Sequence, residues 1–246
     1  MSEPKIFALI IGTEILNRRR EDKHFNFVSN LLKEYGRKLS GSFIIEDDPA
    51  LIVQSIKFLA SQPNSIIFSF GGIGSTPDDY TRKCVAVALR DGTLYTNQEA
   101  KRIIEERLGD KAYPHPINMA ELPKGSKLIE NTFNGMPAFS LDERYFFVPG
   151  FPEMSHPMLR KIAKELFVEK REYYRKTVVA KCKETIFIDI MSDMPDDIEF
   201  SSLPKYNSGE WTTSISIASY DKSLTDSVFA RYINLLDKSQ IEYIKE

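Results

Sequence analysis

Cysteine and histidine are both scarce in this chain of 246 residues. The two cysteines, Cys84 and Cys182, lie far apart, and neither belongs to a C-x-x-C pair. The three histidines, His24, His115 and His156, follow no spacing typical of a zinc site. The sequence therefore predicts neither a disulfide framework nor a zinc site.

An excess of charge of either sign is also missing. The 33 lysine and arginine residues nearly balance 35 aspartates and glutamates, which gives a formal net charge of -2. A chain without a basic field has little attraction for a phosphate backbone. We therefore expect no nucleic-acid partner.

Long hydrophobic runs are absent from the start of the chain. Residues 6–11 form an apolar run that is too short to span a membrane or to act as a signal peptide, and no basic segment precedes it. We expect a cytoplasmic protein without membrane contact. Since 42% of the residues are hydrophobic, a sizeable core can still form.

Apolar strands alternate with amphipathic helices in the first part of the chain. Such strands are predicted at residues 6–11, 42–45 and 65–70, and helices at residues 25–35, 51–59 and around 85–89. Strands that alternate with helices form right-handed crossovers. The predicted fold class is therefore α/β, with three α/β/α layers around a mostly parallel sheet.

The later part of the chain has a different texture. Helices are predicted at residues 99–108 and 158–167, and the segment between them, residues 113–152, is rich in Pro, Gly and Asn and is predicted to be an arm of loops. Short strand-like pieces occur in this segment at residues 127–129 and 145–148.

Two β-rich runs, residues 176–190 and 211–219, precede a last predicted helix at residues 224–236. We therefore predict two domains, residues 1–170 and a small α+β domain at residues 171–246.

The loops that follow the first three strands are expected to be neighbours. In open α/β sheets, ligands bind outside the carboxyl ends of the strands. The third of these loops begins Gly71-Gly72-Ile73-Gly74. Its glycines permit positive φ angles and leave backbone N–H groups free to face an anion.

The next residues, Thr76-Pro77-Asp78-Asp79, have the order of a helix start. Thr76 would be the N-cap, Pro77 the first helical residue, and Asp79 the acidic member of a capping box. A helix N-terminus beside a glycine loop favours phosphate. Because two carboxylates would repel a bare phosphate, the pattern predicts a bridging Mg²⁺.

A simpler interpretation of the acidic pairs stays open. Asp78 and Asp79 would also complement a helix dipole, by roughly 0.3–1 kcal/mol each. Asp47-Asp48-Pro49 is likewise an ordinary helix entry. The occurrence of both pairs at one predicted sheet edge favours a functional role.

The glycine loop differs from the two usual nucleotide-binding loops. It is not followed by the glycine spacing of a dinucleotide fingerprint or by the lysine of a Walker A loop. A Rossmann dehydrogenase and a P-loop kinase are therefore disfavoured.

Several motifs together resemble a known family. They are Gly12-Thr13-Glu14-Ile15-Leu16, Asp47, Gly71-Gly72-Ile73-Gly74, Pro77-Asp78-Asp79 with Thr81, and Val148-Pro149-Gly150-Phe151-Pro152-Glu153-Met154. In this order they resemble the MoaB/Mog-type molybdopterin-binding domain. More closely, they resemble its version in the amino-terminal part of competence/damage-inducible protein A (CinA). The resemblance covers about residues 5–165.

The resemblance implies a site that takes a phosphorylated small molecule, either molybdopterin or an adenine nucleotide, together with Mg²⁺. It implies that Asp47 and Asp79 serve the active site, where they would hold the metal or orient the attacking group. The expected ligand-binding residues are Gly12, Thr13, Glu14, Gly71, Gly72, Gly74, Ser75, Thr76 and Thr81. Relatives of this kind form oligomers, so a homo-oligomer is expected.

The implied chemistry is open in direction. In the CinA group a similar domain is linked to metal-dependent cleavage of ADP-ribose, whereas molybdopterin activation transfers an adenylyl group. A non-catalytic binding module and an assembly role for the small domain are the alternatives.

The chain departs from the CinA pattern in three ways. No segment resembles the nicotinamide-mononucleotide deamidase domain of full-length CinA, so that activity is not expected. Asn118-Met119 stands where a Lys-Gln pair is usual, and residues 134–138 replace a Gly-Thr-Ala-Pro-Gly loop. Arg82, Lys83 or Lys124 could supply the missing positive charge.

The remaining candidates have less specific interpretations. His24 is predicted to be an exposed histidine at a helix entry, and His115 and His156 are predicted to be loop residues. Cys84 is predicted to be a buried, inert thiol. The basic run of residues 18–20 is either solvated or clamps phosphate.

Overall fold

Strand β1 (Ile6–Ile11) lies inside the main sheet of this computed structural model, which describes residues 4–246. All six of its residues are buried, as expected for a strand covered on both faces. It pairs in parallel with β2 (Gly41–Ile45) on one side and with β3 (Ile66–Phe70) on the other.

The sheet continues beyond β3 into the segment that the sequence predicted to be an arm of loops. Strand β8 (Tyr145–Val148) pairs in parallel with β3, and β7 (Ala138–Leu141) and β6 (Lys127–Ile129) add two antiparallel pairings. The order is β2-β1-β3-β8-β7-β6. The strand-like pieces predicted at residues 127–129 and 145–148 are confirmed as β6 and β8. The arm prediction is wrong because the aromatic residues of β7 and β8 are buried, with Phe139 and Phe147 stacked at 4.9 Å.

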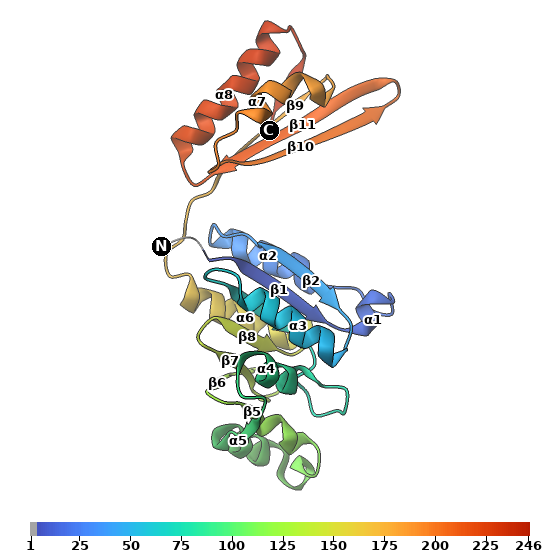
Figure 1. The fold of residues 1–246 in the computed structure, drawn as a ribbon, viewed down its shortest axis with the longest axis vertical. Helices are drawn as coiled ribbons and strands as arrows, with labels where there is room; N and C mark the ends of the chain where they lie inside the picture. The colour runs from blue at the N-terminus through green and yellow to red at the C-terminus, as the bar shows by residue number, and fades with distance from the viewer. Residues whose placement is uncertain (1–3) are drawn as a thin grey trace. The chain divides into compact units, whose positions relative to one another are not determined.

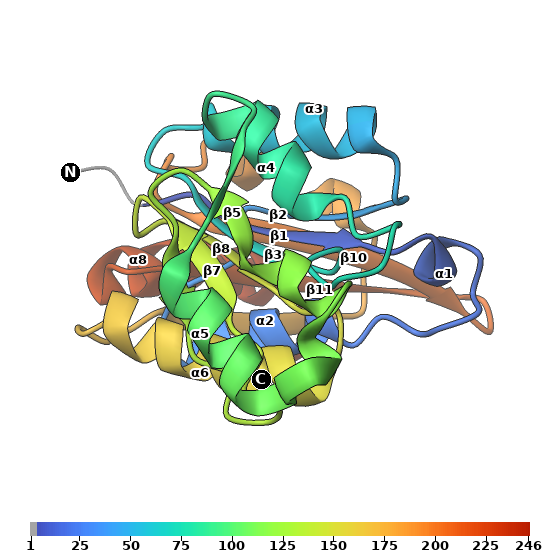
Figure 2. The same cartoon turned by 90° about the horizontal axis from the view of Figure 1, so that it is seen from below.

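Helices cover both faces of this sheet (Figure 2). Helices α2 (His24–Glu34) and α6 (Pro152–Leu166) lie on one face, and α3 (Pro49–Ala60) and α4 (Thr81–Leu89) lie on the other. The predicted three-layer α/β/α class with a mostly parallel sheet is confirmed.

Two of these helices begin at other places than the sequence predicted. Helix α4 begins at Thr81, five residues after the predicted N-cap Thr76. Helix α6 begins at Pro152 rather than at residue 158, and it continues through Pro157 at the cost of one backbone hydrogen bond.

A smaller layer packs beside the main sheet. It contains α5 (Gln98–Leu108), two short 3-10 helices, η1 (Gly109–Ala112) and η2 (Pro116–Ala120), and the pair β4 (Leu94–Thr96) and β5 (Glu121–Pro123). Its own core contains Ala100, Ile104, Ala112 and Ala120. A four-residue helix, α1 (Thr13–Leu16), follows β1.

The chain divides into two units between Glu169 and Lys170. Residues 1–3, which the predicted first domain includes, lie outside the described residues. Figure 1 shows the elements of each unit.

The second unit, Lys170–Glu246, is built on an antiparallel sheet. Its strands β9 (Tyr174–Ala180), β10 (Glu199–Asn207), β11 (Glu210–Ser219) and β12 (Tyr243–Lys245) have the order β10-β11-β9-β12. Helix α8 (Lys222–Lys238) packs on β9 and β11.

The predicted β-rich run of residues 176–190 is wrong in its second half. Strand β9 ends at Ala180, and η3 (Glu184–Phe187) and α7 (Ile188–Ser192) follow. The apolar residues at 186, 187, 190 and 191 recur with a helical period, and Phe187 is fully buried against Tyr232.

Within residues 4–246, no helix combines the length and apolar character that crossing a bilayer requires.

We predict that Leu9→Ala, which empties a fully buried position in β1, lowers the free energy of unfolding by about 2–5 kcal/mol. The matched control is Leu16→Ala, because Leu16 is 52% exposed; we expect a change within about 0.5 kcal/mol. Urea unfolding followed by circular dichroism measures both. Equal losses would contradict the placement of β1 in the core.

Candidate functional site

The carboxyl ends of four parallel strands lie in register at one edge of the main sheet. Ile11 pairs with Ile45, Ile10 with Phe70, and Phe70 with Val148. The loops that follow β1, β2, β3 and β8 therefore start side by side, although they begin at residues 12, 46, 71 and 149.

The glycine loop after β3 is held tightly at its first residues. The Gly71 N–H donates to the Val148 carbonyl at 3.0 Å, and the Thr81 hydroxyl donates to the Gly71 carbonyl at 2.9 Å. A Cβ on Gly71 would lie 2.4 Å from the Ile11 carbonyl oxygen, and φ at Gly71 is +98°. Only glycine fits this position without moving β1.

Thr81 does not face the ligand side as the sequence predicted. Its side chain is fully buried, its hydroxyl is used on Gly71, and its N–H donates to the Gly72 carbonyl at 2.9 Å. Thr81 therefore supports the loop from behind, and the Gly71 N–H is likewise unavailable to a phosphate.

Four consecutive backbone N–H groups of the loop remain available. Within residues 4–246, no acceptor pairs with the N–H of Gly72, Ile73, Gly74 or Ser75. Successive unpaired N–H groups in a glycine loop form a concavity that suits an anion.

Residues 76–79 form a closed turn instead of a helix start. The Asp79 N–H donates to the Thr76 carbonyl at 3.0 Å, and Asp79 Oδ2 accepts from the Thr76 N–H at 2.8 Å and from its hydroxyl at 2.5 Å. The predicted pairing of Thr76 with Asp79 is present, but helix α4 starts later because the Thr81 N–H bonds to Gly72.

Asp47 is held by the first loop in a similar way. Its Oδ2 accepts from the Thr13 N–H at 2.8 Å and from the Thr13 hydroxyl at 2.9 Å, and its own N–H donates to that hydroxyl at 3.0 Å. The neighbouring Asp48 instead caps α3 through Leu51. The Oδ1 atoms of Asp47 and Asp79 accept no hydrogen bond from any residue in the 4–246 range.

These loops enclose a cleft of about 600 Å³. Of the predicted site residues, it is lined by Glu14, Asp47, Gly71, Gly72, Gly74, Ser75, Thr76 and Asp79. Gly12, Thr13 and Thr81 lie outside the lining: Gly12 is buried, and Thr13 and Thr81 hold other parts of the site.

The cleft is rich in acidic side chains. Glu14, Asp47, Asp78 and Asp79 line it, and Arg20 is the one basic side chain among the described lining residues. Arg20 Nη1 lies 3.8 Å from Glu14 Oε1, while Nη2 donates to the Gly150 carbonyl at 3.0 Å. The acidic side chains of the lining therefore repel a free anion, although the backbone N–H groups of the glycine loop attract one.

Sequence reasoning assigned no ligand role to several other residues of the cleft lining. They are Met119, Met136, Met154, Asn131, Asn134, Pro137 and Phe151. Asn134 Oδ1 accepts from the Asn131 side chain at 2.7 Å and from the Met136 N–H at 3.0 Å. The available signals were the motif at residues 148–154, which contains Phe151 and Met154, and the departure of residues 118–119 and 134–138 from the CinA pattern.

Arg82 does not supply positive charge to the cleft. It is 8% exposed, and it donates to the carbonyls of Gly74 at 2.7 Å, of Glu121 at 3.2 Å and of Asn118. Burial lowers the pKa of this guanidinium. Arg82 therefore connects the glycine loop to η2 and to the first residue of β5.

His24 and His156 form a pair that contradicts both predictions for them. His24 is buried, and His156 belongs to α6 rather than to a loop; their Nδ1 and Nε2 atoms lie 3.2 Å apart. The pairing has no signal in the sequence, because the two residues are 132 positions apart. His115 lies at the entry of η2.

Cys84 is a buried thiol, as predicted. Burial, reinforced by the charge of Asp48, raises the pKa of this thiol to about 11. A thiol of this kind is unreactive near neutral pH.

No group of three His, Cys, Asp or Glu side chains that could hold a metal occurs within the described part of the chain.

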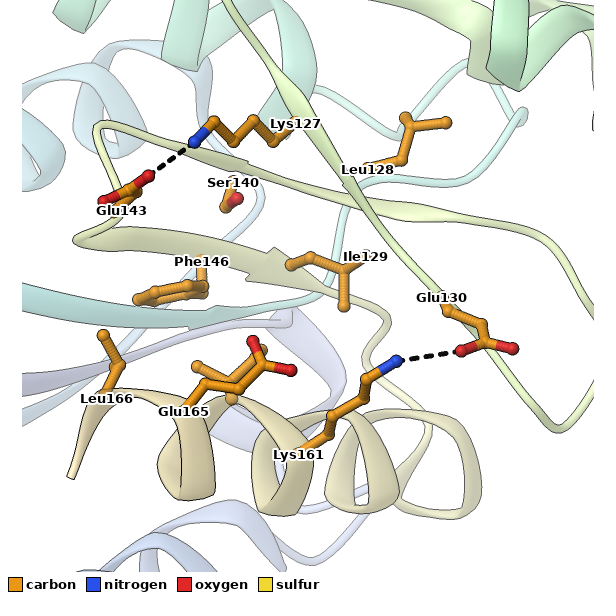
Figure 3. A pocket seen from close by; sticks show the side chains of 11 residues that line it. Lys127, Leu128, Ile129, Glu130, Ser140, Glu143, Phe146, Lys161, Glu165 and Leu166 are labelled. Atoms are coloured by element: carbon orange, nitrogen blue, oxygen red, sulfur yellow. Dashed lines mark hydrogen bonds and ion pairs between the residues drawn. The ribbon is translucent and has the colours of Figure 1, made fainter. Parts of the chain in front are cut away.

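A second cleft, of about 430 Å³, lies between α6 and strands β6 to β8 (Figure 3). Lys161 pairs there with Glu130 at 2.9 Å, and Lys127 pairs with Glu143. Both lysines are thus already neutralised, so this cleft is the weaker candidate for an anionic ligand.

Comparison with known proteins finds a family model that matches the main unit of the chain. Residues 7–168 match the family described as "Probable molybdopterin binding domain". The chain belongs to this family. The match spans every loop of the acidic cleft.

Among individual relatives, a CinA-like protein of Leptospira biflexa is 31% identical over 194 residues, covering 73% of this chain and 46% of that protein. A CinA-like protein of Sulfurihydrogenibium is 27% identical over 216 residues, covering 82% and 52%. The chain thus spans about half the length of these curated relatives.

A solved structure of the protein CinA from Thermoplasma acidophilum has the same fold in the main unit. It covers 66% of this chain and 99% of that one, with a TM-score of 0.60 at 24% identity.

We predict that Gly71→Ala destabilises the protein more than Gly125→Ala. Both glycines have positive φ, at +98° and +79°, so each substitution costs about 1–2 kcal/mol of backbone strain. Only at Gly71 does the new Cβ also meet a backbone atom, whereas nothing lies within 4 Å at Gly125. Urea unfolding checks the order, and equal losses would contradict the close approach of Gly71 to β1.

We also predict that His156 makes stability depend on pH. Burial lowers the pKa of His156 to about 4, so below pH 6.5 the unfolded chain binds more protons than the folded one. The contribution of the neutral His156 to the free energy of unfolding is therefore fully present above pH 6.5, and it is lost as the pH falls toward 4. The melting temperature of His156→Gln should fall less than that of the wild type between pH 7 and pH 4.5. Parallel pH profiles would show that the buried pair carries no such linkage.

Proposed function

We propose that the acidic cleft binds a phosphorylated pterin or an adenine nucleotide diphosphate together with Mg²⁺, and that it carries out phosphoanhydride chemistry of the ADP-ribose hydrolysis type. The observation that carries this proposal is the unpaired N–H run of Gly72–Ser75 beside two carboxylates with open oxygens.

The N–H run is suited to phosphate oxygens. The absence of a side chain at Gly74 lets the Asp79 carboxylate lie close to the backbone of the loop, because a Cβ there would lie 2.6 Å from Asp79 Oδ2. Backbone N–H groups that are already aimed at the anion require no reorganisation when charge develops on it.

The carboxylates fit Mg²⁺ rather than an all-protein metal cage. Mg²⁺ is usually bound by one or two carboxylates, several waters and the phosphates of the substrate. Asp47 and Asp79 each keep Oδ1 open while Oδ2 is fixed by a threonine. When bound, Mg²⁺ would neutralise the phosphate oxygens and so offset the repulsion from the acidic lining.

The residues of the cleft would then have separate roles in binding and catalysis. Thr13 orients Asp47, and Thr76 orients Asp79, so that both Oδ1 atoms can hold the metal or accept the proton of the attacking water. Arg20 supplies positive charge beside Glu14 and Gly150. Gly72 to Ser75 hold the phosphate.

The methionine side chains of the cleft are suited to a ligand that contains a ring. Met119, Met136 and Met154 offer polarizable apolar surface, and Phe151 adds an aromatic face. The Asn134 amide can contact the polar edge of a ring. Both an adenine and a pterin have these properties, so the choice between them is left to experiment.

Hydrolysis is the direction we favour for a test. Water attacks phosphorus, the phosphoanhydride P–O bond breaks, and ADP-ribose yields AMP and ribose 5-phosphate. The names of the CinA-like relatives describe longer proteins, so their activities enter here only as part of the proposal. The cytoplasmic location and the homo-oligomer stay predictions.

We predict that Asp79→Asn lowers the rate of AMP release from ADP-ribose with Mg²⁺ by at least about 100-fold. The amide keeps an oxygen for the Thr76 N–H but loses the charge that would hold metal or take a proton. Product formation is measured by chromatography under multiple-turnover conditions.

The matched control is Asp110→Asn, which neutralises an exposed carboxylate outside the cleft. Its rate should stay within about twofold of the wild type. Equal turnover in wild type and Asp79→Asn would remove Asp79 from the mechanism.

A binding module without turnover is the second candidate. Arg20 is the sole basic side chain among the described lining residues, and it is already engaged by Glu14 and Gly150, which leaves little charge for a leaving group. Calorimetric binding of ADP-ribose or a pterin phosphate without product after long incubation would favour this candidate, whereas multiple turnover would eliminate it.

A further inference from the structure

The His24–His156 pair lies directly behind one wall of the acidic cleft. That wall is the segment Pro149–Phe151, which follows β8 and lines the cleft. His24 Nε2 lies 3.2 Å from the Gly150 carbonyl oxygen, and His24 Nδ1 lies 3.2 Å from His156 Nε2. Neither histidine lines the cleft itself.

The chemistry of the partners fixes the proton positions on both rings. A backbone carbonyl can only accept, so the proton of His24 must be on Nε2. In the neutral ring Nδ1 can then only accept, so His156 must carry its proton on Nε2. The pair thus has a single direction, from His156 through His24 to the Gly150 carbonyl.

Aromatic packing fixes the orientation of the two rings. His24 stacks on Phe70 with centroids 4.2 Å apart, and His156 stacks on Phe27 at 3.7 Å with an interplanar angle of 2°. Phe70 is the last residue of β3 and directly precedes the glycine loop. The His24 ring is therefore anchored to the strand end from which that loop begins, and the His156 ring is anchored to Phe27 of α2.

The Gly150 carbonyl connects the wall to the loop that follows β1. It accepts from Arg20 Nη2 at 3.0 Å as well as from His24. Gly150 also lies against the glycine loop, because a Cβ built on it would be 3.3 Å from Gly71 Cα. A rotation of this peptide would move Phe151 and would press on Gly71.

We propose that His24 and His156 are positioning residues that hold the Gly150 peptide, and with it the Pro149–Phe151 wall, in the orientation that admits the ligand. The orientation of the wall then depends on two successive hydrogen bonds, from His156 to His24 and from His24 to the Gly150 carbonyl, as well as on the sequence of the loop. The part of this proposal that concerns ligand affinity rests on the function proposed above.

The charged surroundings of the pair are compatible with neutral rings at pH 7. Asp22, whose carboxylate caps the His24 N–H at 2.8 Å, and Glu153 act to raise the pKa of His24, while Arg20 acts to lower it. Arg160, which lies over Phe27, acts to lower the pKa of His156. Burial outweighs these charges and lowers the pKa of both histidines.

The tautomers can be read directly by long-range ¹H–¹⁵N correlation spectra of the ¹⁵N-labelled full chain at pH 7. With three histidines in the sequence, His115→Gln leaves only the signals of the pair to assign. We expect both rings to be neutral and protonated on Nε2. A charged ring, or an Nδ1–H tautomer on either residue, would overturn the proposal.

The positioning role is tested with His156→Phe and His156→Gln. Phenylalanine keeps a ring on Phe27 but cannot donate to His24, whereas glutamine can supply a side-chain N–H. Loss of one hydrogen bond should speed amide exchange at Met154 and Ser155, whose N–H groups donate to the Phe151 carbonyl, about threefold to tenfold in His156→Phe, with recovery in His156→Gln. Equal exchange in His156→Phe and wild type would overturn the role.

Affinity is measured with ADP-ribose and Mg²⁺ by calorimetry on the same variants. We expect about threefold to tenfold weaker binding for His156→Phe and wild-type binding for His156→Gln. Unchanged affinity in His156→Phe would overturn the effect on the ligand. If the wild type itself does not bind ADP-ribose, the proposed function fails, while the tautomer and exchange results still decide the positioning role.

Discussion

The parallel register of β1, β2, β3 and β8 is the constraint on which the site depends. Because Ile11 lies beside Ile45, and Phe70 beside Val148, four loops from distant parts of the chain begin at one edge. None of them could form the acidic cleft alone. The buried strands behind them hold that edge rigid, since side chains on both faces are packed against helices.

Two opposite electrostatic demands meet in this cleft. The unpaired N–H groups of Gly72–Ser75 attract an anion, whereas four carboxylates repel one. A ligand that is at once a phosphate and the partner of a divalent cation satisfies both demands. The threonines that fix Asp47 and Asp79 also limit how far either carboxylate can turn away.

Much of this arrangement could be predicted from local patterns. The strands were predictable because a buried parallel strand is a continuous apolar run, and the cleft edge followed from their common direction. What could not be predicted depends on tertiary contacts: the late start of α4, the burial of Thr81, and the pairing of His24 with His156. Strand β7 was hidden because Pro, Gly and Asn in its neighbourhood resemble loop sequence.

The three carbonyls that accept from the Arg82 guanidinium belong to Gly74 of the glycine loop, Asn118 of η2 and Glu121 of β5. Because Arg82 lies 39 positions from Glu121 along the chain, part of the support for the glycine loop comes from a layer that is distant in sequence. An insertion or deletion in that layer would therefore change the shape of the glycine loop without altering any residue of the loop itself.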